Sequence, residues 1–464
     1  MLLTTNMFVK HVTLPFYILF AVSYEMNHTF CVLAATDEKP LILTPYIKNG
    51  KIAEARNLSK VDPEQFDGTQ SYSGFFAVNQ QHNSNLFFWF FPSQTDYPNA
   101  PLILWLDGGP GESNMMSIFG GIGPLHLTGD GYPKRGEYSF TKHHSVLYID
   151  NPVGTGYSFT DKDGYVKNET IIGTELYEAL QQFFQLFHET QNNDFYVYGI
   201  SYGGKYAPSL SHTIHHKNKS AKEKINLKGM ILANSWSDPL HQAMHSEYLY
   251  QIGLIDGNTK IKFREREYVL RNHINGKQWK AATEEYNKII LSYNDSLYKS
   301  VTGFVGFHNF LQQVLDLKEY NAIENYVNKS VREALHIGNT LPYCAFCENV
   351  FYALEDDMMQ SVSFKVSELL DHYRVLIYTG QLDILVAYPM TVNFLRHLQF
   401  KGADEYASAI RRKWYVDNEL AGYTKQVGTL TEVLVRNAGH SAAFDKPQWA
   451  LDVITRFISN QTLS

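Results

Sequence analysis

Residues 196–208 read YVYGISYGGKYAP, an apolar run that leads into a serine between two glycines. Its central part, GISYG (199–203), fits the pattern G-x-S-x-G and lies between an apolar segment and a segment with apolar residues every fourth position. A strand that turns sharply into a helix exposes the serine, and its glycines avoid collisions with the neighbouring strand and helix. A plain glycine-rich turn is the alternative, but the strand before it and the helix after it favour a nucleophilic Ser201.

Six apolar segments bounded by turn residues are typical of buried strands: 101–108, 145–150, 195–199, 229–234, 374–380 and 432–439. Each is apolar nearly throughout, which predicts a parallel sheet covered on both faces. Segments 72–78 and 85–91 flank a turn and predict an antiparallel hairpin at one edge. Helical periodicity is expected at 171–191 and near 447–459. The sequence therefore predicts an α/β fold with a doubly wound, mostly parallel sheet.

The alternation of strands and helices stops between residues 238 and 365. That stretch is richer in Lys, Glu, Asn and Tyr and shows helical patterns, so we expect an inserted, mainly helical cap domain at 238–365. The core then consists of residues 65–237 and 366–464. Such an insertion would lie over the carboxyl ends of the strands, where open α/β sheets bind ligands.

The N-terminus is typical of a secretory leader, because basic residues precede the apolar run VTLPFYILFAV (12–22) and small residues follow it. We expect a signal peptide at 1–23, and the apolar patch at 30–35 leaves cleavage as far as residue 35 open. A buried N-terminal strand is the alternative. The run is too short to span a bilayer comfortably, so no membrane span is expected after leader removal. Acceptor motifs for N-glycans agree with secretory entry to an extracellular or lysosomal destination: Asn27, Asn57, Asn168, Asn218, Asn294, Asn328 and Asn460.

Charge and cysteine content exclude several classes of function. The formal net charge of −7 and the lack of a basic stripe argue against a nucleic-acid partner. Cys31 lies in or near the leader, so Cys344 and Cys347 remain as a single C-x-x-C. The pair could be a local disulfide, half of a metal site or two free thiols; we interpret it as structural. No metal and no organic cofactor are expected.

A nucleophilic serine needs a base, and the base needs an acid that orients it. His440 follows the sixth strand in RNAGH, and Asp383 follows the fifth in TGQLD. Both are expected at carboxyl ends of strands, on the same edge as Ser201, in the chain order serine, acid, histidine. The alternatives are a surface-loop histidine and a helix N-cap aspartate, and the shared placement of all three residues disfavours both.

The oxyanion of an acyl-transfer reaction needs backbone N–H donors. The loop LDGGPGESN (106–114) follows the first long strand, and Gly108 and Gly109 let its backbone approach closely. We expect the N–H groups of Gly109 and Tyr202 to form this oxyanion hole. A phosphate-binding loop is the alternative, but no lysine follows as a P-loop requires.

Five separated motifs are similar to those of one family: LWLDGGPGESNM (104–115), LYIDNPVGTGYSFT (147–160), YGISYGGKYAP (198–208), VLIYTGQLDILV (375–386) and VRNAGHSAAFDKP (435–447). On these motifs the chain resembles, over roughly residues 65–460, the serine carboxypeptidases of the α/β-hydrolase fold, and among them the vitellogenic carboxypeptidase-like proteins. The resemblance implies a Ser201–Asp383–His440 triad and removal of C-terminal residues from peptide substrates at acid pH. Dimers occur in this family, so a homodimer is one expectation, although no residue in the sequence establishes it.

The family binds the substrate's terminal carboxylate with an amide and two Glu side chains, and the sequence departs at each. Asp107 replaces the amide before Gly108, Ile200 stands before the serine in place of Glu, and Gly121 occupies the position of the second Glu. A hydrogen bond to a charged group contributes about 1.5–3 kcal/mol. Like charges about 4 Å apart cost roughly 4 kcal/mol at an effective dielectric constant of about 20. Preference for a free C-terminus is therefore expected to fall.

Three hypotheses follow. The first is a serine carboxypeptidase that works through an acyl-enzyme. The second is a hydrolase or acyltransferase of the same fold that acts on esters, C-terminal amides or other neutral or cationic compounds, because the carboxylate site is altered. The third is a secreted binding or storage protein without turnover, against which the retention of Ser201, Asp383 and His440 argues.

Overall fold

The computed structural model describes residues 38–129, 131–292, 295–314 and 317–463; the expected leader, Asn27 and Asn294 lie outside them. The strands are β1 Lys60–Val61, β2 Ser71–Asn79, β3 Ser84–Phe91, β4 Leu102–Leu106, β5 Leu125–Leu127, β6 Pro133–Arg135, β7 Ser145–Ile149, β8 Phe195–Ile200, β9 Leu227–Ala233, β10 Arg374–Gly380, β11 Arg412–Val416, β12 Glu419–Val427 and β13 Leu430–Val435. The helices are α1 Thr44–Lys48, α2 Ile52–Leu58, α3 Met115–Phe119, α4 Glu169–Leu186, α5 Gly203–Lys217, α6 Pro239–Gln242, α7 Ser246–Gln251, α8 Gly257–Asn275, α9 Trp279–Tyr286, α10 Leu297–Thr302, α11 Lys318–Lys329, α12 Glu348–Ala353, α13 Ser363–Leu370, α14 Tyr388–His397, α15 Ala403–Ser408, α16 Ala442–Asp445 and α17 Pro447–Ile458.

One large sheet runs through the molecule in the order β1-β2-β3-β7-β4-β8-β9-β10-β13-β12-β11. Its central strands, β7, β4, β8, β9, β10 and β13, are parallel to their neighbours within that group, and they coincide with the six apolar segments of the sequence. The β2–β3 hairpin pairs antiparallel with β7 at one side, as expected. The predicted α/β fold with a mostly parallel sheet is confirmed.

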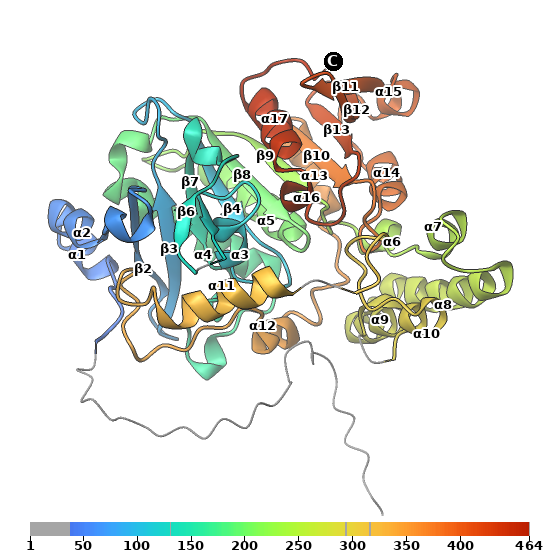
Figure 1. The fold of residues 1–464 in the computed structure, drawn as a ribbon, viewed down its shortest axis with the longest axis horizontal. Helices are drawn as coiled ribbons and strands as arrows, with labels where there is room; N and C mark the ends of the chain where they lie inside the picture. The colour runs from blue at the N-terminus through green and yellow to red at the C-terminus, as the bar shows by residue number, and fades with distance from the viewer. Residues whose placement is uncertain (1–37, 130, 293–294, 315–316, 464) are drawn as a thin grey trace, which may run out of the picture.

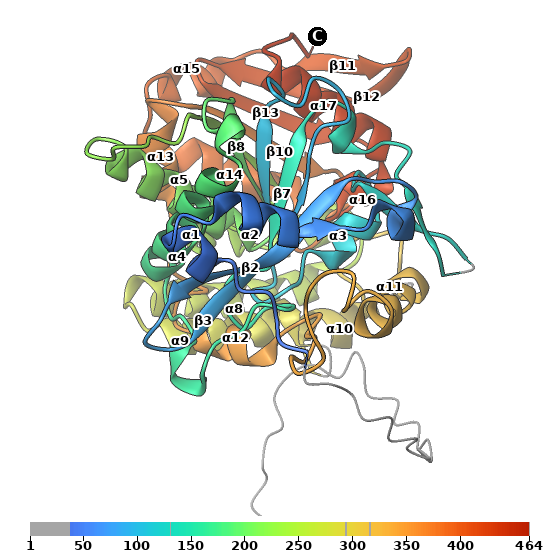
Figure 2. The same cartoon turned by 90° about the vertical axis from the view of Figure 1, so that its left-hand side faces the viewer.

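Helices cover both faces of this sheet (Figures 1 and 2). The apolar stripes of α4 and α5 are buried in one hydrophobic cluster, and α3 and α17 contribute to the cluster on the opposite face. Helix α4 begins where the Asn168 side chain accepts hydrogen bonds from the N–H groups of Thr170 and Ile171, which caps its first turn.

The segment 238–365 holds helices α6 to α12, and none of the named strands lies in its described part. Helices α8, α9 and α10 gather at the lower end of the molecule in both views (Figures 1 and 2). The division into core and cap domain stays a prediction, but the helical content of this segment agrees with it.

The sequence analysis did not place the antiparallel pair β11 and β12, which extends the sheet beyond β13. Its two-residue turn is Asp417–Asn418, where φ is 47° and 65°. Positive φ at both central positions is typical of a type I′ hairpin turn, and Asn and Asp tolerate it better than most residues. The outer strand β11 begins with Arg412 and Lys413, and such charges protect a sheet edge.

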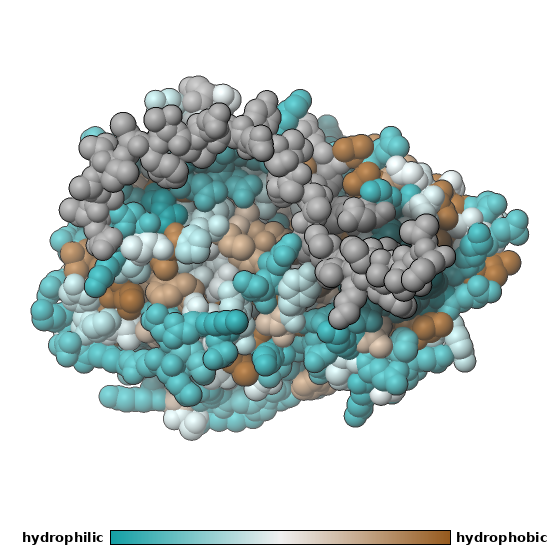
Figure 3. All heavy atoms as spheres, turned by 90° about the horizontal axis from the view of Figure 1, so that it is seen from below, coloured by the Kyte–Doolittle hydropathy of each residue, from teal (hydrophilic) through white to brown (hydrophobic). Residues whose placement is uncertain are grey.

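No helix among the described residues is both long and apolar enough to cross a bilayer. The face shown in Figure 3 is largely hydrophilic, and its hydrophobic side chains lie in small separate groups.

Candidate active site

Ser201 lies between the end of β8 and the start of α5 with a φ of 56°, a left-handed conformation that non-glycine residues seldom adopt. Its N–H donates to the Ala233 carbonyl at 3.0 Å, and its carbonyl accepts from the Trp236 N–H at 2.8 Å. A Cβ at Gly199 would lie 2.1 Å from the Gly203 carbonyl oxygen, so the expected steric need for glycine in this turn is real.

Asp383 and His440 follow the neighbouring strands β10 and β13, and their side chains meet. The His440 Nδ1 atom lies 2.8 Å from Asp383 Oδ2, and both residues are buried. Because a carboxylate can only accept, Nδ1 carries the proton and Nε2 keeps its lone pair. Asp383 Oδ1 accepts from the N–H groups of Leu385 and Val386 at 2.8 and 3.2 Å, which fixes the carboxylate.

Two residues that the sequence analysis missed support this pair. Asn234, at the end of β9, donates from Nδ2 to Asp383 Oδ2 at 2.7 Å. The ring of His308 stacks on that of His440 with centroids 5.2 Å apart, and the His440 N–H donates to the His308 carbonyl at 2.7 Å. A polar residue at a strand end could have indicated Asn234, whereas His308 lies in the helical segment and carries no local signal.

The loop after β4 lies directly against the serine turn. A Cβ at Gly108 would be 2.8 Å from both the Tyr202 nitrogen and Ser201 Cβ, so only glycine allows this approach. Gly109 has a φ of 103° and lines the same cavity as Ser201. The two N–H groups expected to form the oxyanion hole, those of Gly109 and Tyr202, thus belong to adjoining backbone segments.

The disulfide-bonded segment 344–347 is hydrogen-bonded to the loop after β4. Cys344 and Cys347 are joined, which selects the disulfide among the three states left open by the sequence. The Cys347 N–H donates to the Gly111 carbonyl and the Ser113 N–H donates to the Ala345 carbonyl, both at 2.9 Å. The pair therefore positions the loop that carries Gly109.

Ser201 and His440 line a cavity of about 1170 Å³. Its lining includes the acidic residues Asp107, Glu112, Glu319, Glu324, Glu348 and Asp445. None of the lining residues in the described part of the chain is a lysine or an arginine. The described lining thus carries several acidic side chains and no side chain that is always cationic.

Asp107 and Glu112 form a carboxyl pair in the cavity wall. Burial and then the nearby Glu112 carboxylate raise the pKa of Asp107 well above its usual range, and burial also raises the pKa of Glu112. Asp107 Oδ1 accepts from Trp105 Nε1 at 2.9 Å and from the Ser117 hydroxyl at 2.8 Å, while Oδ2 is buried without a partner among the described residues. Glu112 is a further residue that the sequence analysis did not single out.

Of the other two altered positions in the expected carboxylate site, one lines the cavity and the other does not in the described part of the chain. Ile200 is buried and lines the cavity next to Ser201. Gly121 does not line the cavity in the described part of the chain; a Cβ there would lie 2.7 Å from the Ala443 carbonyl oxygen and 3.3 Å from the Phe444 ring. Phe444, which lies beside Gly121, lines the cavity itself.

Fold and site together define an α/β-hydrolase with a serine-type active-site arrangement. The chain belongs to the serine carboxypeptidase family, which its residues 63–460 match. It is 45% identical to a venom serine carboxypeptidase of Apis mellifera over 96% of this chain and 98% of that protein. It is 43% identical to a vitellogenic carboxypeptidase of Aedes aegypti and 42% identical to a probable serine carboxypeptidase, CPVL, of Homo sapiens, each over 90% of both chains.

A solved structure shows the same fold. The crystal structure of Kex1(Δ)p, a prohormone-processing carboxypeptidase from Saccharomyces cerevisiae, superposes with a TM-score of 0.77 at 22% identity, covering 87% of this chain and 96% of that one. The expected family and the expected enzyme class, a serine-type carboxypeptidase, are thus confirmed.

Proposed function

We propose that the chain removes C-terminal residues from peptides through an acyl-enzyme on Ser201. The observation that carries this assignment is the 2.8 Å hydrogen bond between His440 and Asp383 at the cavity that Ser201 also lines. It leaves His440 Nε2 as the unprotonated nitrogen, which a general base requires.

In the proposed reaction, His440 Nε2 takes the Ser201 hydroxyl proton while Oγ attacks the scissile carbonyl carbon. The N–H groups of Gly109 and Tyr202 stabilise the resulting oxyanion. The intermediate collapses as His440 returns the proton to the leaving amine, which frees the C-terminal amino acid and leaves an ester on Ser201. Water, deprotonated by the same nitrogen, then hydrolyses the ester, and Asp383 stabilises the imidazolium at both stages.

Recognition of a free C-terminus in this cavity depends on pH. A protonated carboxyl group donates a hydrogen bond, whereas a carboxylate only accepts. Because the pKa values of Asp107 and Glu112 are raised, both groups stay neutral to higher pH than ordinary carboxyls. We infer that they bind the substrate carboxylate as neutral donors at acid pH and repel it once they ionise.

A second function, hydrolysis of esters or C-terminal amides, or acyl transfer to an amine, is favoured by the acidic lining of the cavity. Ile200 offers no donor, and neither lysine nor arginine is found among the described lining residues. Above the pKa values of the carboxyl pair, a neutral or cationic leaving group therefore fits this site better than an anionic one.

The proposed setting is the secretory pathway, ending outside the cell or in a lysosome. Three of the N-glycan acceptor motifs, at Asn57, Asn328 and Asn460, have exposed asparagine side chains, which supports glycosylation at these positions. A homodimer stays a prediction from the family resemblance.

The test uses the secreted protein and a Ser201→Ala control. Ser201 is first titrated with a fluorophosphonate probe, and then a blocked dipeptide, its C-terminal amide and its ester are supplied at pH 4.5 and 7. Probe binding with cleavage of the free acid at pH 4.5 supports the carboxypeptidase assignment. Probe binding with cleavage of ester or amide alone supports the second function. Folded protein whose Ser201 does not react with the probe would contradict both and support a non-catalytic binding protein.

A further inference from the structure

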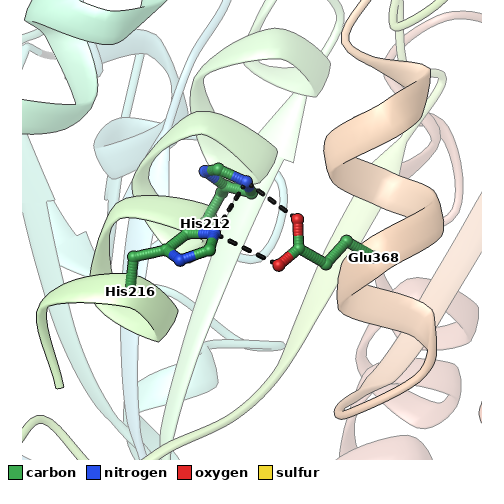
Figure 4. A group of neighbouring side chains, drawn as sticks. All are labelled: His212, His216 and Glu368. Atoms are coloured by element: carbon green, nitrogen blue, oxygen red, sulfur yellow. Dashed lines mark hydrogen bonds and ion pairs between the residues drawn. The ribbon is translucent and has the colours of Figure 1, made fainter. Parts of the chain in front are cut away.

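Away from the Ser201 cavity, three side chains of types that bind metals converge between α5 and α13 (Figure 4). His212 and His216 project from successive turns of α5, and Glu368 faces them from α13. His212 Nε2 lies 3.1 Å from Glu368 Oε2, and His216 Nε2 lies 3.1 Å from Glu368 Oε1. The two Nε2 atoms are themselves 3.1 Å apart.

These separations match those around a tetrahedral ion. Zinc binds imidazole nitrogen at about 2.0–2.1 Å and carboxylate oxygen at similar distance, so tetrahedral ligand atoms are about 3.3 Å apart. The three atoms therefore need only small side-chain adjustments to surround one ion. Histidines four positions apart on a helix present their rings on one face, which is why this spacing recurs in metal sites.

Without a metal, each Nε2 atom faces one oxygen of Glu368, and the two Nε2 atoms lie side by side. One divalent ion can bind both ring nitrogens and the carboxylate at a common centre. The site is neither sealed nor fully exposed, because the side chains of His212, His216 and Glu368 are 23, 43 and 37% accessible. An ion can therefore enter from solvent.

We propose that His212, His216 and Glu368 bind one Zn²⁺ ion, with water completing the coordination. The two imidazoles are borderline ligands, so a set of two imidazoles and one carboxylate suits zinc better than calcium or magnesium, which prefer oxygen ligands throughout. The bound ion would fasten the C-terminal part of α5 to α13. Helix α5 begins two residues after Ser201, and at 1.5 Å per residue the ion would lie roughly 16–22 Å along the helix from that serine. The proposed role is thus structural.

Two side chains beside the proposed ligands, those of Lys219 and His215, bear on how an ion can bind. Lys219 Nζ lies 3.4 Å from His216 Nδ1, which must carry a proton once Nε2 binds the ion, so this exposed lysine has to turn into solvent. His215 Nε2 lies 3.9 Å from Glu368 Oε1, and His215 Nδ1 is 3.0 Å from the Tyr373 hydroxyl. His215 is therefore the nearest further imidazole, although it is not one of the three converging ligands.

The test uses the full secreted protein without a polyhistidine tag, stripped with a chelator and then exposed to Zn²⁺ at pH 7.5. Zinc per chain is measured by mass spectrometry after gel filtration, and affinity by competition with a chromophoric chelator. The variants are His216→Asn and Glu368→Gln, with the exposed His126→Asn as a matched control. Circular dichroism and fluorophosphonate labelling of Ser201 establish that each variant is folded.

We expect one zinc per chain in the wild-type protein and in His126→Asn, and at least tenfold weaker binding in both ligand variants, because each loses one of three protein ligands. Zn²⁺ should raise the melting temperature of the wild type and leave that of the ligand variants unchanged. Absence of zinc from the wild type, or equal zinc affinity in folded Glu368→Gln, would overturn the proposal.

Discussion

Asn234 and His440 bind the same oxygen atom of Asp383. Asn234 Nδ2 donates to Oδ2 at 2.7 Å and His440 Nδ1 lies 2.8 Å from it. The amide thus fixes the plane of the carboxylate that orients the proposed base. Asn234 also has a φ of 41°, a left-handed conformation that Asn accepts more readily than most residues.

Replacement of Asn234 by Gly is expected to lower kcat about 10- to 100-fold, because one hydrogen bond to a charged group, worth about 1.5–3 kcal/mol, is lost. Glycine is the suitable substitute, since it accommodates the positive φ at this position. The measurement is kcat on a neutral ester, with fluorophosphonate titration to count competent sites. An unchanged kcat would show that the two N–H groups from Leu385 and Val386 position Asp383 without help.

Replacement of Asp107 by Asn is expected to improve cleavage of free-acid peptides at pH 7. The new Oδ1 keeps the bonds from Trp105 and Ser117, while the amide NH₂ places a donor where a carboxylate oxygen now has no partner. The expected gain in kcat/KM is about 10- to 100-fold from one donor to a charged group.

The control for this experiment is the matching ester, whose kcat/KM should change little. Adding Ile200→Glu to Asp107→Asn should raise free-acid cleavage further at acid pH, where that Glu is protonated. If neither variant discriminates between acid and ester, the carboxylate is bound elsewhere in the cavity.

Replacement of Glu112 by Gln is expected to move the acid limb of the pH profile to lower pH. Burial disfavours the charged His440 ring, but Asp383 and Glu112 outweigh it and raise the pKa of His440. Where Glu112 is ionised, its charge stabilises the imidazolium, so its removal lowers the pKa of His440 and the base stays neutral at lower pH. Measured on a neutral ester, kcat/KM against pH reports this group in the free enzyme.

Glu348→Gln serves as the control, since Glu348 lines the same cavity and is exposed. Its acid limb should coincide with that of the wild type. An equal shift of the acid limb in both variants would indicate a general effect of cavity charge and would contradict a specific role of Glu112.

The central strands were predictable because each is a nearly uninterrupted apolar run, and the structure places all six in one parallel array. Ser201, Asp383 and His440 follow three of these strands, so their meeting at one edge could be expected from topology. The glycine-rich loop after β4 contacts the start of α5, where a Cβ at Gly108 would lie 2.8 Å from the Tyr202 nitrogen. The oxyanion hole of Gly109 and Tyr202 stays a prediction.

Other features depend on contacts that no local pattern records. His308 reaches His440 from the helical segment, and only the packing of that segment on the sheet brings them together. Gly121 was expected in the carboxylate site, yet it is not among the described residues that line the cavity, whereas the neighbouring Phe444 is. The carboxyl of Glu112 was visible in LDGGPGESN, but its effect on the pKa of His440 is Coulombic and depends on their proximity in the fold, which a local sequence pattern does not record.

Replacement of the buried Glu169 by Gln is expected to reduce the decline in the free energy of unfolding as the pH rises toward neutrality. Burial, and then the Asp357 carboxylate, raise the pKa of Glu169 from 4.5 to about 8, against the opposing charges of Lys205 and Lys365. Between these two pKa values the folded protein holds a proton that the unfolded chain has lost. Stability from this group is therefore complete below about pH 4.5 and declines as pH rises toward about 8.

The decline from this group should amount to on the order of 3–4 kcal/mol between pH 5 and 8, at 1.36 kcal/mol per pH unit. Urea unfolding of the wild type and Glu169→Gln at pH 5, 6.5 and 8 measures it, with the exposed Glu64→Gln as control. The Glu169 variant should gain stability relative to the wild type as pH rises, because Gln remains neutral throughout. If the free energy of unfolding changes with pH in the same way in all three proteins, Glu169 is ionised in the folded state. Any greater stability at acid pH would then come from another buried group.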